Sequence, residues 1–267
     1  MLTKETVARH FSKAASTYDT QATVQLEMAS LLLKKLLSYQ KDNTAFNQIL
    51  EIGCGTGQLS SMLMESLDFK KLVLNDFSED MLLSCQKKFD GTNKSNLIDY
   101  MHADAEKLNL DNKYDLIISN ACFQWFKDLK KALNNFKSLL TADGIIAFTT
   151  FGEGNFKELK QSSSFGLDYL SRLQIETILQ ELDLEYSFEE KVTTSYFADI
   201  KAMLKSFKQT GVSGLSHQIW TKQKLFDFTK AYEELRQAKG LPLTWVSYFV
   251  IAKPKAEINL SLKMQRR

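Results

Sequence analysis

The sequence is poor in the residues that build disulfide frameworks and metal sites. Its 267 residues include three cysteines, three histidines and two prolines. Cys54, Cys85 and Cys122 lie far apart and form no Cys-x-x-Cys pair, which is typical of reduced thiols. No cluster of His, Cys, Asp or Glu has the spacing of metal ligands, so we expect no metal. With no Gly/Ser-rich spacer either, the sequence predicts no flexible linker.

The sequence also lacks a strong charge of either sign and any long hydrophobic run. The 34 Lys and Arg residues nearly balance 32 Asp and Glu residues, so no overall field favours nucleic acid or an anionic membrane. No run of about eighteen apolar residues could span a bilayer. The first residues mix charges where a signal peptide needs an apolar stretch. We therefore expect a cytoplasmic protein that binds neither nucleic acid nor membrane.

Short apolar runs alternate with helical patterns up to about residue 150. After amphipathic helices within residues 7–37, the predicted strands occupy residues 48–52, 72–75, 97–102, 116–119 and 145–149. Helices are predicted between them, near residues 58–67, 78–89 and 128–140. Buried strands that alternate with helices indicate right-handed crossovers and a parallel sheet. The sequence therefore predicts a doubly wound, Rossmann-like α/β fold.

The pattern becomes helix-rich after residue 150. Helices are predicted at residues 156–161, 172–182, 199–209 and 222–238. Two strand-like stretches, residues 187–196 and 245–252, are expected to complete the mostly parallel sheet with an antiparallel edge strand.

These patterns divide the chain into three parts. Residues 1–42 are expected to form helices that cover the ligand site. The core comprises residues 43–151, 187–196 and 243–254. Residues 152–186 and 197–242 are expected to form a helical lid and substrate region over the carboxyl ends of the strands, where ligands bind in open α/β sheets.

A glycine loop, containing Gly53, Gly55 and Gly57, lies between the first of these core strands and a helix. There the chain must turn sharply and let a ligand approach the backbone. A dinucleotide fingerprint needs a glycine one position after Gly57, where Gln58 stands, so the pattern disfavours a pyrophosphate. Thr56 and the free amides of the next helix can still receive a polar ligand group.

Aspartates follow the next two predicted strands. Asp76 comes about 20 residues after the glycine loop, a spacing that suits a carboxylate bound to both ribose hydroxyls. Asp104 ends the third strand, where it could accept a hydrogen bond from the exocyclic amine of adenine. Each aspartate alone is more often a turn or N-cap residue. Their order after the glycine loop favours a nucleoside ligand.

These motifs together resemble those of the class I S-adenosylmethionine-dependent methyltransferases. The resemblance covers roughly residues 45–150 and rests on residues 51–57, 76–81 and 103–105. It implies S-adenosylmethionine as the cofactor, S-adenosylhomocysteine as the product and no metal. The cofactor contacts expected on this basis are Tyr18, Glu51, Gly53, Gly55, Thr56, Gly57, Asp76, Phe77, Met81, Asp104, Ala105 and Asn120.

Four further segments, residues 11–25, 119–125, 147–159 and 241–245, resemble the malonyl-acyl carrier protein O-methyltransferases of biotin synthesis. This resemblance implies methylation of the free carboxylate of a malonyl thioester, on the carrier protein or on coenzyme A, to give the ester that primes pimeloyl synthesis. A carboxylate with a pKa near 4 is already ionised at neutral pH, so no general base is needed. Tyr18, Gln124 and Trp125 would then act by orientation.

The acceptor residues are expected to include Tyr18, Gln124, Trp125, Tyr169 and Arg172. A buried carboxylate needs a partner, and related enzymes carry an arginine just before an aromatic in the lid. The matching stretch here is Leu167-Asp168-Tyr169, which leaves Arg172 as the nearest arginine. Lys201, Lys205 and Lys208 recur on one face of a predicted lid helix, where they could dock an acidic carrier protein.

Two other functions remain open from the sequence. The generic motifs also fit a methyltransferase that acts on a free small carboxylic acid or a quinone precursor. They fit a non-catalytic nucleoside-binding module as well, because an intact cofactor site does not prove turnover.

Overall fold

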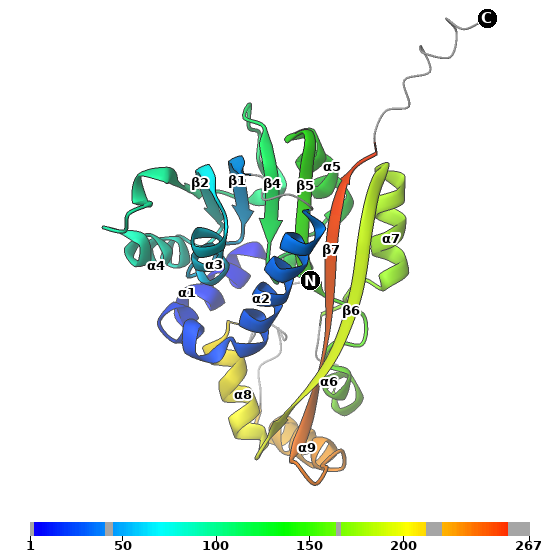
Figure 1. Cartoon of the computed structure of the whole chain (residues 1–267). Coiled ribbons are helices and arrows are strands. Elements are labelled where there is room, and N and C mark those ends of the chain that lie inside the picture. The colour runs from blue at the N-terminus through cyan, green and yellow to red at the C-terminus, as the bar shows by residue number, and fades with distance from the viewer. Residues whose placement is uncertain (1–2, 41–44, 164–166, 212–220, 256–267) are drawn as a thin grey trace, which may run out of the picture.

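The computed structural model describes residues 3–40, 45–163, 167–211 and 221–255 (Figure 1). Parts of the expected N-terminal region and lid, residues 41–44, 164–166 and 212–220, lie outside the described residues. The described strands are β1 Phe46–Ile52, β2 Phe69–Asp76, β3 Ile98–His102, β4 Tyr114–Ser119, β5 Leu140–Phe151, β6 Leu184–Phe197 and β7 Leu241–Pro254.

Helices separate most of these strands. The α-helices are α1 Lys4–Gln21, α2 Thr23–Tyr39, α3 Gln58–Ser66, α4 Glu79–Phe89, α5 Leu129–Ser138, α6 Lys157–Ser162, α7 Arg172–Glu181, α8 Ile200–Gln209 and α9 Lys222–Glu233. Within the described ranges there are also three short 3₁₀ helices, η1 Ser95–Leu97, η2 Ala105–Lys107 and η3 Phe123–Trp125. The alternation predicted up to residue 150 is therefore present in the structure.

The strands form one seven-stranded sheet in the order β3-β2-β1-β4-β5-β7-β6. The first five are parallel, and β7 runs antiparallel between β5 and β6. The predicted doubly wound fold with an antiparallel strand at one edge is confirmed. In the register, Ile52 pairs with Asn75 on one side and with Ser119 on the other. The segments that follow β1, β2 and β4 therefore start at the same edge of the sheet.

The sheet separates two apolar clusters, because successive side chains of a strand point to opposite faces. In β4, Leu116 belongs to one cluster and Ile117 to the other. Helices α2, α3 and α4 pack on the first face. Helices α5 and α7 cover the second face, where Ile175 and Leu179 of α7 are fully buried.

Helix α7 thus differs from the expected lid, since it packs on the sheet as a core helix. Ser171 and Gln174 begin it with a capping box, and its two buried residues lie four apart on one helical face. Helices α6, α8 and α9 instead lie beyond the carboxyl ends of the parallel strands, beside the long projecting ends of β6 and β7 (Figure 1). Each of those two strands has 14 residues, more than the sequence predicted.

Among the described helices, none has the length and apolar character needed to cross a bilayer. The longest, α1, carries charged residues such as Lys4 and Glu5, and it buries only Ala14 completely. It lies at the carboxyl ends of β1 and β2, where it contacts both α4 and α8.

Candidate active site

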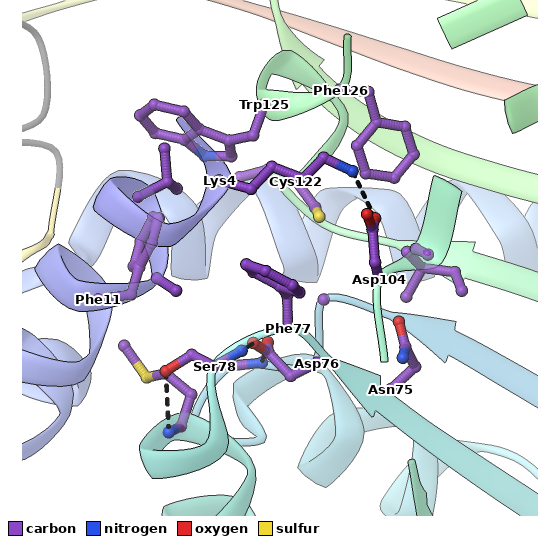
Figure 2. Close-up of a pocket in the computed structure, with 18 of the residues that line it drawn as sticks. Lys4, Phe11, Asn75, Asp76, Phe77, Ser78, Asp104, Cys122, Trp125 and Phe126 are labelled. Atoms are coloured by element: carbon purple, nitrogen blue, oxygen red, sulfur yellow. Dashed lines mark hydrogen bonds and ion pairs between the residues drawn. The ribbon is translucent and has the colours of Figure 1, made fainter. Parts of the chain in front are cut away.

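A pocket lies where the carboxyl ends of β1, β2 and β4 meet α1 (Figure 2). We call it the cofactor pocket. Of the twelve residues expected to contact the cofactor, nine line it: Tyr18, Gly53, Gly55, Asp76, Phe77, Met81, Asp104, Ala105 and Asn120. Glu51, Thr56 and Gly57 do not belong to its lining. The fold therefore brings most of this set together, although the set spans residues 18 to 120 of the chain.

The three glycines of the loop have different roles. Gly53 has φ +69°, and a Cβ placed on it would come within 2.5 Å of the Cys122 Sγ atom. Gly55 has φ +56°, but its added Cβ would meet nothing within 4 Å, because this residue faces the open pocket. Gly57 has φ +83° and packs against α4, where a Cβ would come within 2.8 Å of the Cys85 Sγ atom. Only the first two leave backbone exposed to a ligand.

Asp76 is anchored by the backbone on both sides of the pocket. Its carboxylate accepts the N–H of Gly55 at 2.8 Å and the N–H of Ser78 at 2.7 Å. Burial raises the pKa of Asp76, while hydrogen bonds from Ser78, Gly55 and Phe77 oppose that rise. The carboxylate is thus held in one orientation at the end of β2, and it keeps lone pairs that a ligand hydroxyl could use.

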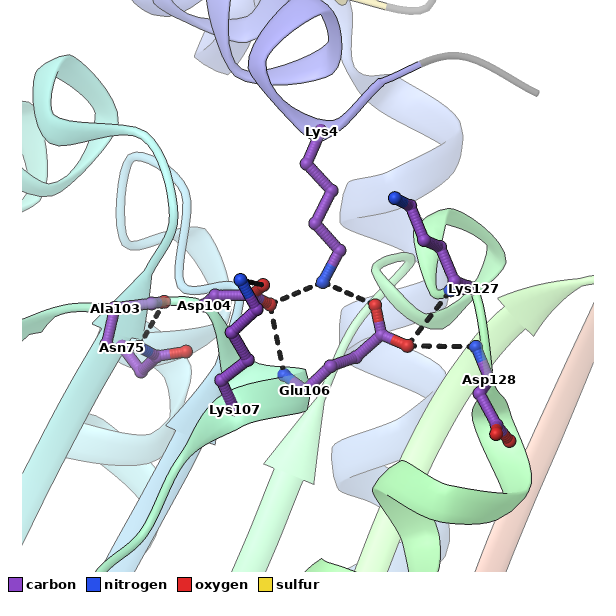
Figure 3. Close-up of polar contacts among 8 residues, drawn as sticks. All are labelled: Lys4, Asn75, Ala103, Asp104, Glu106, Lys107, Lys127 and Asp128. Atoms are coloured by element: carbon purple, nitrogen blue, oxygen red, sulfur yellow. Dashed lines mark hydrogen bonds and ion pairs between the residues drawn. The ribbon is translucent and has the colours of Figure 1, made fainter.

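Asp104 is part of a charged cluster that ties α1 to the pocket (Figure 3). Lys4, in the first turn of α1, forms ion pairs with both Asp104 and Glu106. The other oxygen of Glu106 accepts the backbone N–H groups of Lys127 and Asp128 at 3.0 and 2.9 Å. Lys4 was not among the expected site residues, because a single lysine that lies 100 residues from its partner in the chain belongs to no sequence motif.

The far end of α1 is tied to the glycine loop. The Thr56 hydroxyl donates a hydrogen bond to the carboxylate of Asp19. The same carboxylate forms an ion pair with Lys88 at 2.8 Å. Between the two ends, the hydroxyls of Ser12 and Ser78 lie 3.0 Å apart. Helix α1 is therefore held over the cofactor pocket at both ends and at its middle. Thr56 serves this attachment instead of lining the pocket.

Glu51 lies behind the glycine loop and is only 1% exposed. Ser60 of α3 donates a hydrogen bond of 2.6 Å to its carboxyl group. Burial raises the pKa of Glu51 to about 8, the Ser60 hydrogen bond opposes the rise, and the nearby Asp76 adds to it. In the free protein at pH 7, this carboxyl group is therefore mostly neutral.

A second, smaller cavity adjoins the cofactor pocket, and we call it the inner cavity. Four of the five expected acceptor residues line it: Tyr18, Gln124, Trp125 and Tyr169. The cavity shares Phe11, Tyr18, Ala121 and Trp125 with the cofactor pocket. Its volume is about 10 Å³, which holds about one water molecule. The structure thus places the expected acceptor residues directly beside the expected cofactor residues.

The polar groups of the inner cavity differ in whether they have hydrogen-bond partners within the protein. Gln124 donates to the Ala121 carbonyl at 2.6 Å and accepts from the Thr150 hydroxyl at 3.2 Å, so both ends of its amide have protein partners. Trp125 differs, because its buried indole Nε1–H has no hydrogen-bond partner among the described residues. Burial raises the pKa of both Tyr18 and Tyr169, so each hydroxyl stays protonated at neutral pH.

The backbone is strained where the two cavities meet. Ala121 follows β4 with φ 49°, a left-handed conformation that is uncommon for a residue with a side chain. Its N–H is held by the Thr149 hydroxyl at 2.9 Å, and the same hydroxyl donates to Asn120 at 2.6 Å. Asn120 in turn donates to the Gln25 carbonyl of α2 at 2.9 Å. This network fixes the turn that leads to Gln124 and Trp125.

Arg172 does not reach either cavity, contrary to our expectation. Its guanidinium pairs with Glu176 one turn along α7, at 3.0 Å, and lies over the Phe188 ring at 4.9 Å from the centroid. The packing of α7 on the sheet directs Arg172 to the exposed edge beside β6. No other Lys or Arg of the described residues lines the inner cavity.

Lys201, Lys205 and Lys208 are exposed on α8, opposite the buried residues Met203 and Phe207. None of the three forms an ion pair within the described part of the chain. Their role in docking stays a prediction. The described residues also contain no group of three or more His, Cys, Asp or Glu side chains that could hold a metal ion.

Known proteins resemble this chain in both sequence and fold. Residues 50–148 match the methyltransferase domain family. A malonyl-[acyl-carrier protein] O-methyltransferase of Bacteroides thetaiotaomicron is 34% identical, over 95% of this chain and 99% of the relative. One of Calditerrivibrio nitroreducens is 32% identical, over 94% and 97%. Magnesium protoporphyrin IX methyltransferase of Synechocystis, solved with bound SAM, shares the fold with a TM-score of 0.52 and 13% identity, over 88% and 82%. The chain therefore belongs to the malonyl-[acyl-carrier protein] O-methyltransferase family.

Proposed function

We propose that this protein transfers a methyl group from S-adenosylmethionine to the free carboxylate of malonyl-acyl carrier protein. The observation that carries the proposal is the inner cavity, where Tyr18, Trp125 and Tyr169 meet directly beside the cofactor pocket. The names of the relatives support the same acceptor. The product would be a methyl ester, whose uncharged end can serve as an apolar primer for chain extension.

The residues of the cofactor pocket fit S-adenosylmethionine. Gly55 exposes its backbone to the pocket, and any side chain there would fill the space a ligand needs. The fixed carboxylate of Asp76 suits the two ribose hydroxyls, and Phe77, Met81 and Ala105 offer apolar surfaces to an adenine ring. Asp104 keeps an acceptor oxygen for the adenine amine, although Lys4 and the Glu106 N–H already hold its other oxygen.

The bound cofactor would supply an electrophilic methyl group on a sulfonium. With the cofactor held by Gly55, Asp76 and Asp104, this methyl group would be open to attack by the acceptor carboxylate oxygen, and the electron pair of the carbon–sulfur bond would stay on sulfur. A negative and a positive charge disappear together in this step, so a site that excludes water favours it. The aromatic walls of the inner cavity, which include Phe11, Phe151 and Phe156, provide such a site.

The acceptor carboxylate would be oriented by neutral donors. The free indole N–H of Trp125 is one, and the protonated hydroxyls of Tyr18 and Tyr169 are two more. No described cation lines the inner cavity, and the sulfonium itself offers the positive charge that a buried carboxylate needs. Gln124 acts indirectly, because its amide holds the turn that presents Trp125.

The direct test is mass spectrometry of malonyl-acyl carrier protein after incubation with the protein and S-adenosylmethionine. We expect the mass of one added methyl group on the malonyl moiety and an equal amount of S-adenosylhomocysteine. Parallel reactions with free malonate and with an unacylated carrier protein serve as controls.

The same assay separates the alternatives. Faster methylation of free acids than of the carrier-bound malonyl group would favour a small-acid methyltransferase and overturn the proposal. Tight binding of S-adenosylmethionine in calorimetry, without methylation of any acyl acceptor, would instead indicate a nucleoside-binding module.

A further inference from the structure

A larger groove opens on the face of the sheet that α5 and α7 cover, and we call it the outer groove. Its volume is about 380 Å³. Its walls come from four parts of the chain: η3 with the start of α5, the end of β5, residues 167–170, and α7. Val7 of α1 also lines it. The sequence analysis did not predict this groove.

The outer groove adjoins both cavities of the active site. Gln124, Phe151 and Tyr169 line the groove as well as the inner cavity. Val7 and Phe126 line the groove as well as the cofactor pocket. Trp125 lines all three spaces, and its buried indole N–H has no partner among the described residues.

The walls of the outer groove are mainly apolar, and its rim is charged. Leu167, Leu170, Ile175 and Ile178 form much of the wall. On the rim, Asp128 caps α5, Asp168 pairs with Lys160, and Lys130 pairs with Glu181. Lys127 is exposed and forms no ion pair among the described residues, although its charge acts on the nearby carboxylate of Glu5 in α1. The groove therefore combines a long apolar wall with one available cation at its mouth.

We propose that the outer groove receives the phosphopantetheine arm of the malonyl-carrier protein, with Lys127 facing the phosphodiester. This inference rests on the proposed function. An inner cavity with room for about one water molecule cannot hold a thioester chain, so the arm must occupy a neighbouring space. The groove is that space, because it ends at the residues that would orient the carboxylate.

The position of the groove also indicates on which face of the sheet the carrier protein would dock. Ile175 of the groove belongs to the apolar cluster on one face of the sheet, whereas Met203 and Phe207 of α8 belong to the cluster on the other face. The groove thus favours a carrier protein at the start of α5 over one at the lysines of α8. An acidic partner near Lys127 would also gain from attraction that salt weakens.

A first experiment blocks the groove. Ile178→Trp places a large side chain in its wall, and Leu173→Trp adds the same group to an exposed position of α7 outside the groove. We expect Ile178→Trp to lower kcat/KM for malonyl-carrier protein about 20-fold or more, since an arm that fills the groove would be displaced. Leu173→Trp should stay within about twofold of the wild type. S-adenosylmethionine affinity and melting temperature, measured for both variants, check that the cofactor pocket and the fold are intact.

A second experiment reverses the charge of Lys127 and leaves the apolar wall of the outer groove unchanged. Lys127→Glu should raise KM for malonyl-carrier protein about fivefold or more, and should leave KM for malonyl-N-acetylcysteamine, which lacks the phosphate, within about twofold. Lys131→Glu is the matched control, because Lys131 lies in the first turn of α5, four residues after Lys127, and does not line the groove. Lys205→Glu tests the face of α8.

The outcomes separate the two proposals. If wild-type protein methylates neither malonyl thioester, the proposed function fails. If it methylates malonyl-carrier protein while Ile178→Trp and Lys127→Glu behave like their controls, the proposed function stands and the outer groove is not the path of the arm. A loss confined to Lys205→Glu would also overturn the groove and place the carrier protein on α8.

Discussion

The cofactor pocket and the inner cavity share a wall but are built in different ways. The pocket uses the turns that follow adjacent parallel strands, and its main polar group, Asp76, is fixed by backbone N–H groups. The inner cavity is formed by aromatic and amide side chains from α1, α2, η3, β5 and two later segments. Its donors are the hydroxyls of Tyr18 and Tyr169 and the indole N–H of Trp125, which is buried without a partner among the described residues.

This difference corresponds to two chemical tasks. A nucleoside carries many hydroxyl and amine groups, so its site needs directional partners with fixed geometry. The transfer step joins two opposite charges into neutral products, so its site mainly needs to exclude water. The two regions act separately if a substitution in the pocket changes cofactor affinity and leaves the acceptor KM unchanged. A substitution in the inner cavity should then change the acceptor KM and leave cofactor affinity unchanged.

The largest effect is expected from Gly53→Ala in the cofactor pocket. A left-handed conformation costs an alanine about 1–2 kcal/mol, and the contact with Cys122 adds about 1–3 kcal/mol. We expect S-adenosylmethionine affinity to fall at least about 100-fold by calorimetry, because the loop must move. Gly91→Ala is the control: Gly91 has φ +76° in open space outside the pocket, so its substitution should leave affinity unchanged. Equal losses in both variants would show that backbone strain alone is responsible.

The next effect concerns the buried carboxyl group behind the loop. Because burial raises the pKa of Glu51 from 4.5 to about 8, the stability that its neutral form contributes is complete below about pH 4.5 and is lost as the pH rises through about 8. Glu51→Gln stays neutral at every pH. Between pH 5.5 and 8 we expect the wild type to lose roughly 3 kcal/mol of unfolding free energy relative to this variant, measured by urea denaturation.

Glu65→Gln makes the same chemical change at an exposed position of α3 and serves as the control for Glu51. Parallel pH dependences of the wild type and Glu51→Gln would mean that Glu51 is already ionised in the folded protein. In that case a buried charge would lie behind the glycine loop, and the contrast with the inner cavity would be larger still.

Asp76→Ala should weaken S-adenosylmethionine binding by about 1–3 kcal/mol, the scale for removing a hydrogen-bonded charged group. At saturating cofactor, KM for the acceptor should stay unchanged. Asp115→Ala is a matched control, because Asp115 accepts the N–H groups of Asn47 and Gln48 at 2.6 and 3.0 Å at the opposite edge of the sheet. It should lower stability without lowering cofactor affinity. Unchanged affinity in the Asp76 variant would contradict the assignment of Asp76 to the ribose.

The sequence was sufficient to predict the cofactor pocket because that pocket follows local rules. Gly53 and Gly55 follow β1 and Asp76 ends β2, and parallel strands bring such positions to one edge of the sheet. Gly57 and Thr56 were expected in the pocket by the same rules, but they do not line it. Their side of the loop faces α4 and α1, and the motif alone does not tell which face of a loop contacts a helix and which contacts a ligand.

The acceptor region was predicted less completely because its contacts are long-range. Tyr18, Gln124, Trp125 and Tyr169 were proposed from resemblance, and the structure brings them together. Arg172 was chosen only because it is the nearest arginine in the sequence, and the packing of α7 directs it away. The partner of Asp104 depends on where α1 lies, which no periodicity within residues 4–21 reveals.

The smallest effect, and the sharpest test of the inner cavity, is expected from Trp125→Phe. This substitution keeps an aromatic ring at the position that packs against Phe11, 5.7 Å away between ring centroids, and removes the indole N–H together with the volume of one ring. If that group binds the acceptor carboxylate, acceptor KM should rise about 5- to 10-fold, on the order of 1 kcal/mol, with cofactor affinity within about twofold. Trp245→Phe is the matched control for the loss of ring volume, because the Trp245 indole N–H is satisfied by Ser195 at 3.0 Å and the residue packs behind Phe151 and Phe156 without lining either cavity. It should lower the melting temperature without changing KM. If Trp125→Phe instead weakens the cofactor and the acceptor equally, the two regions are one coupled site, and the division between polar pocket and aromatic cavity does not describe how the protein works.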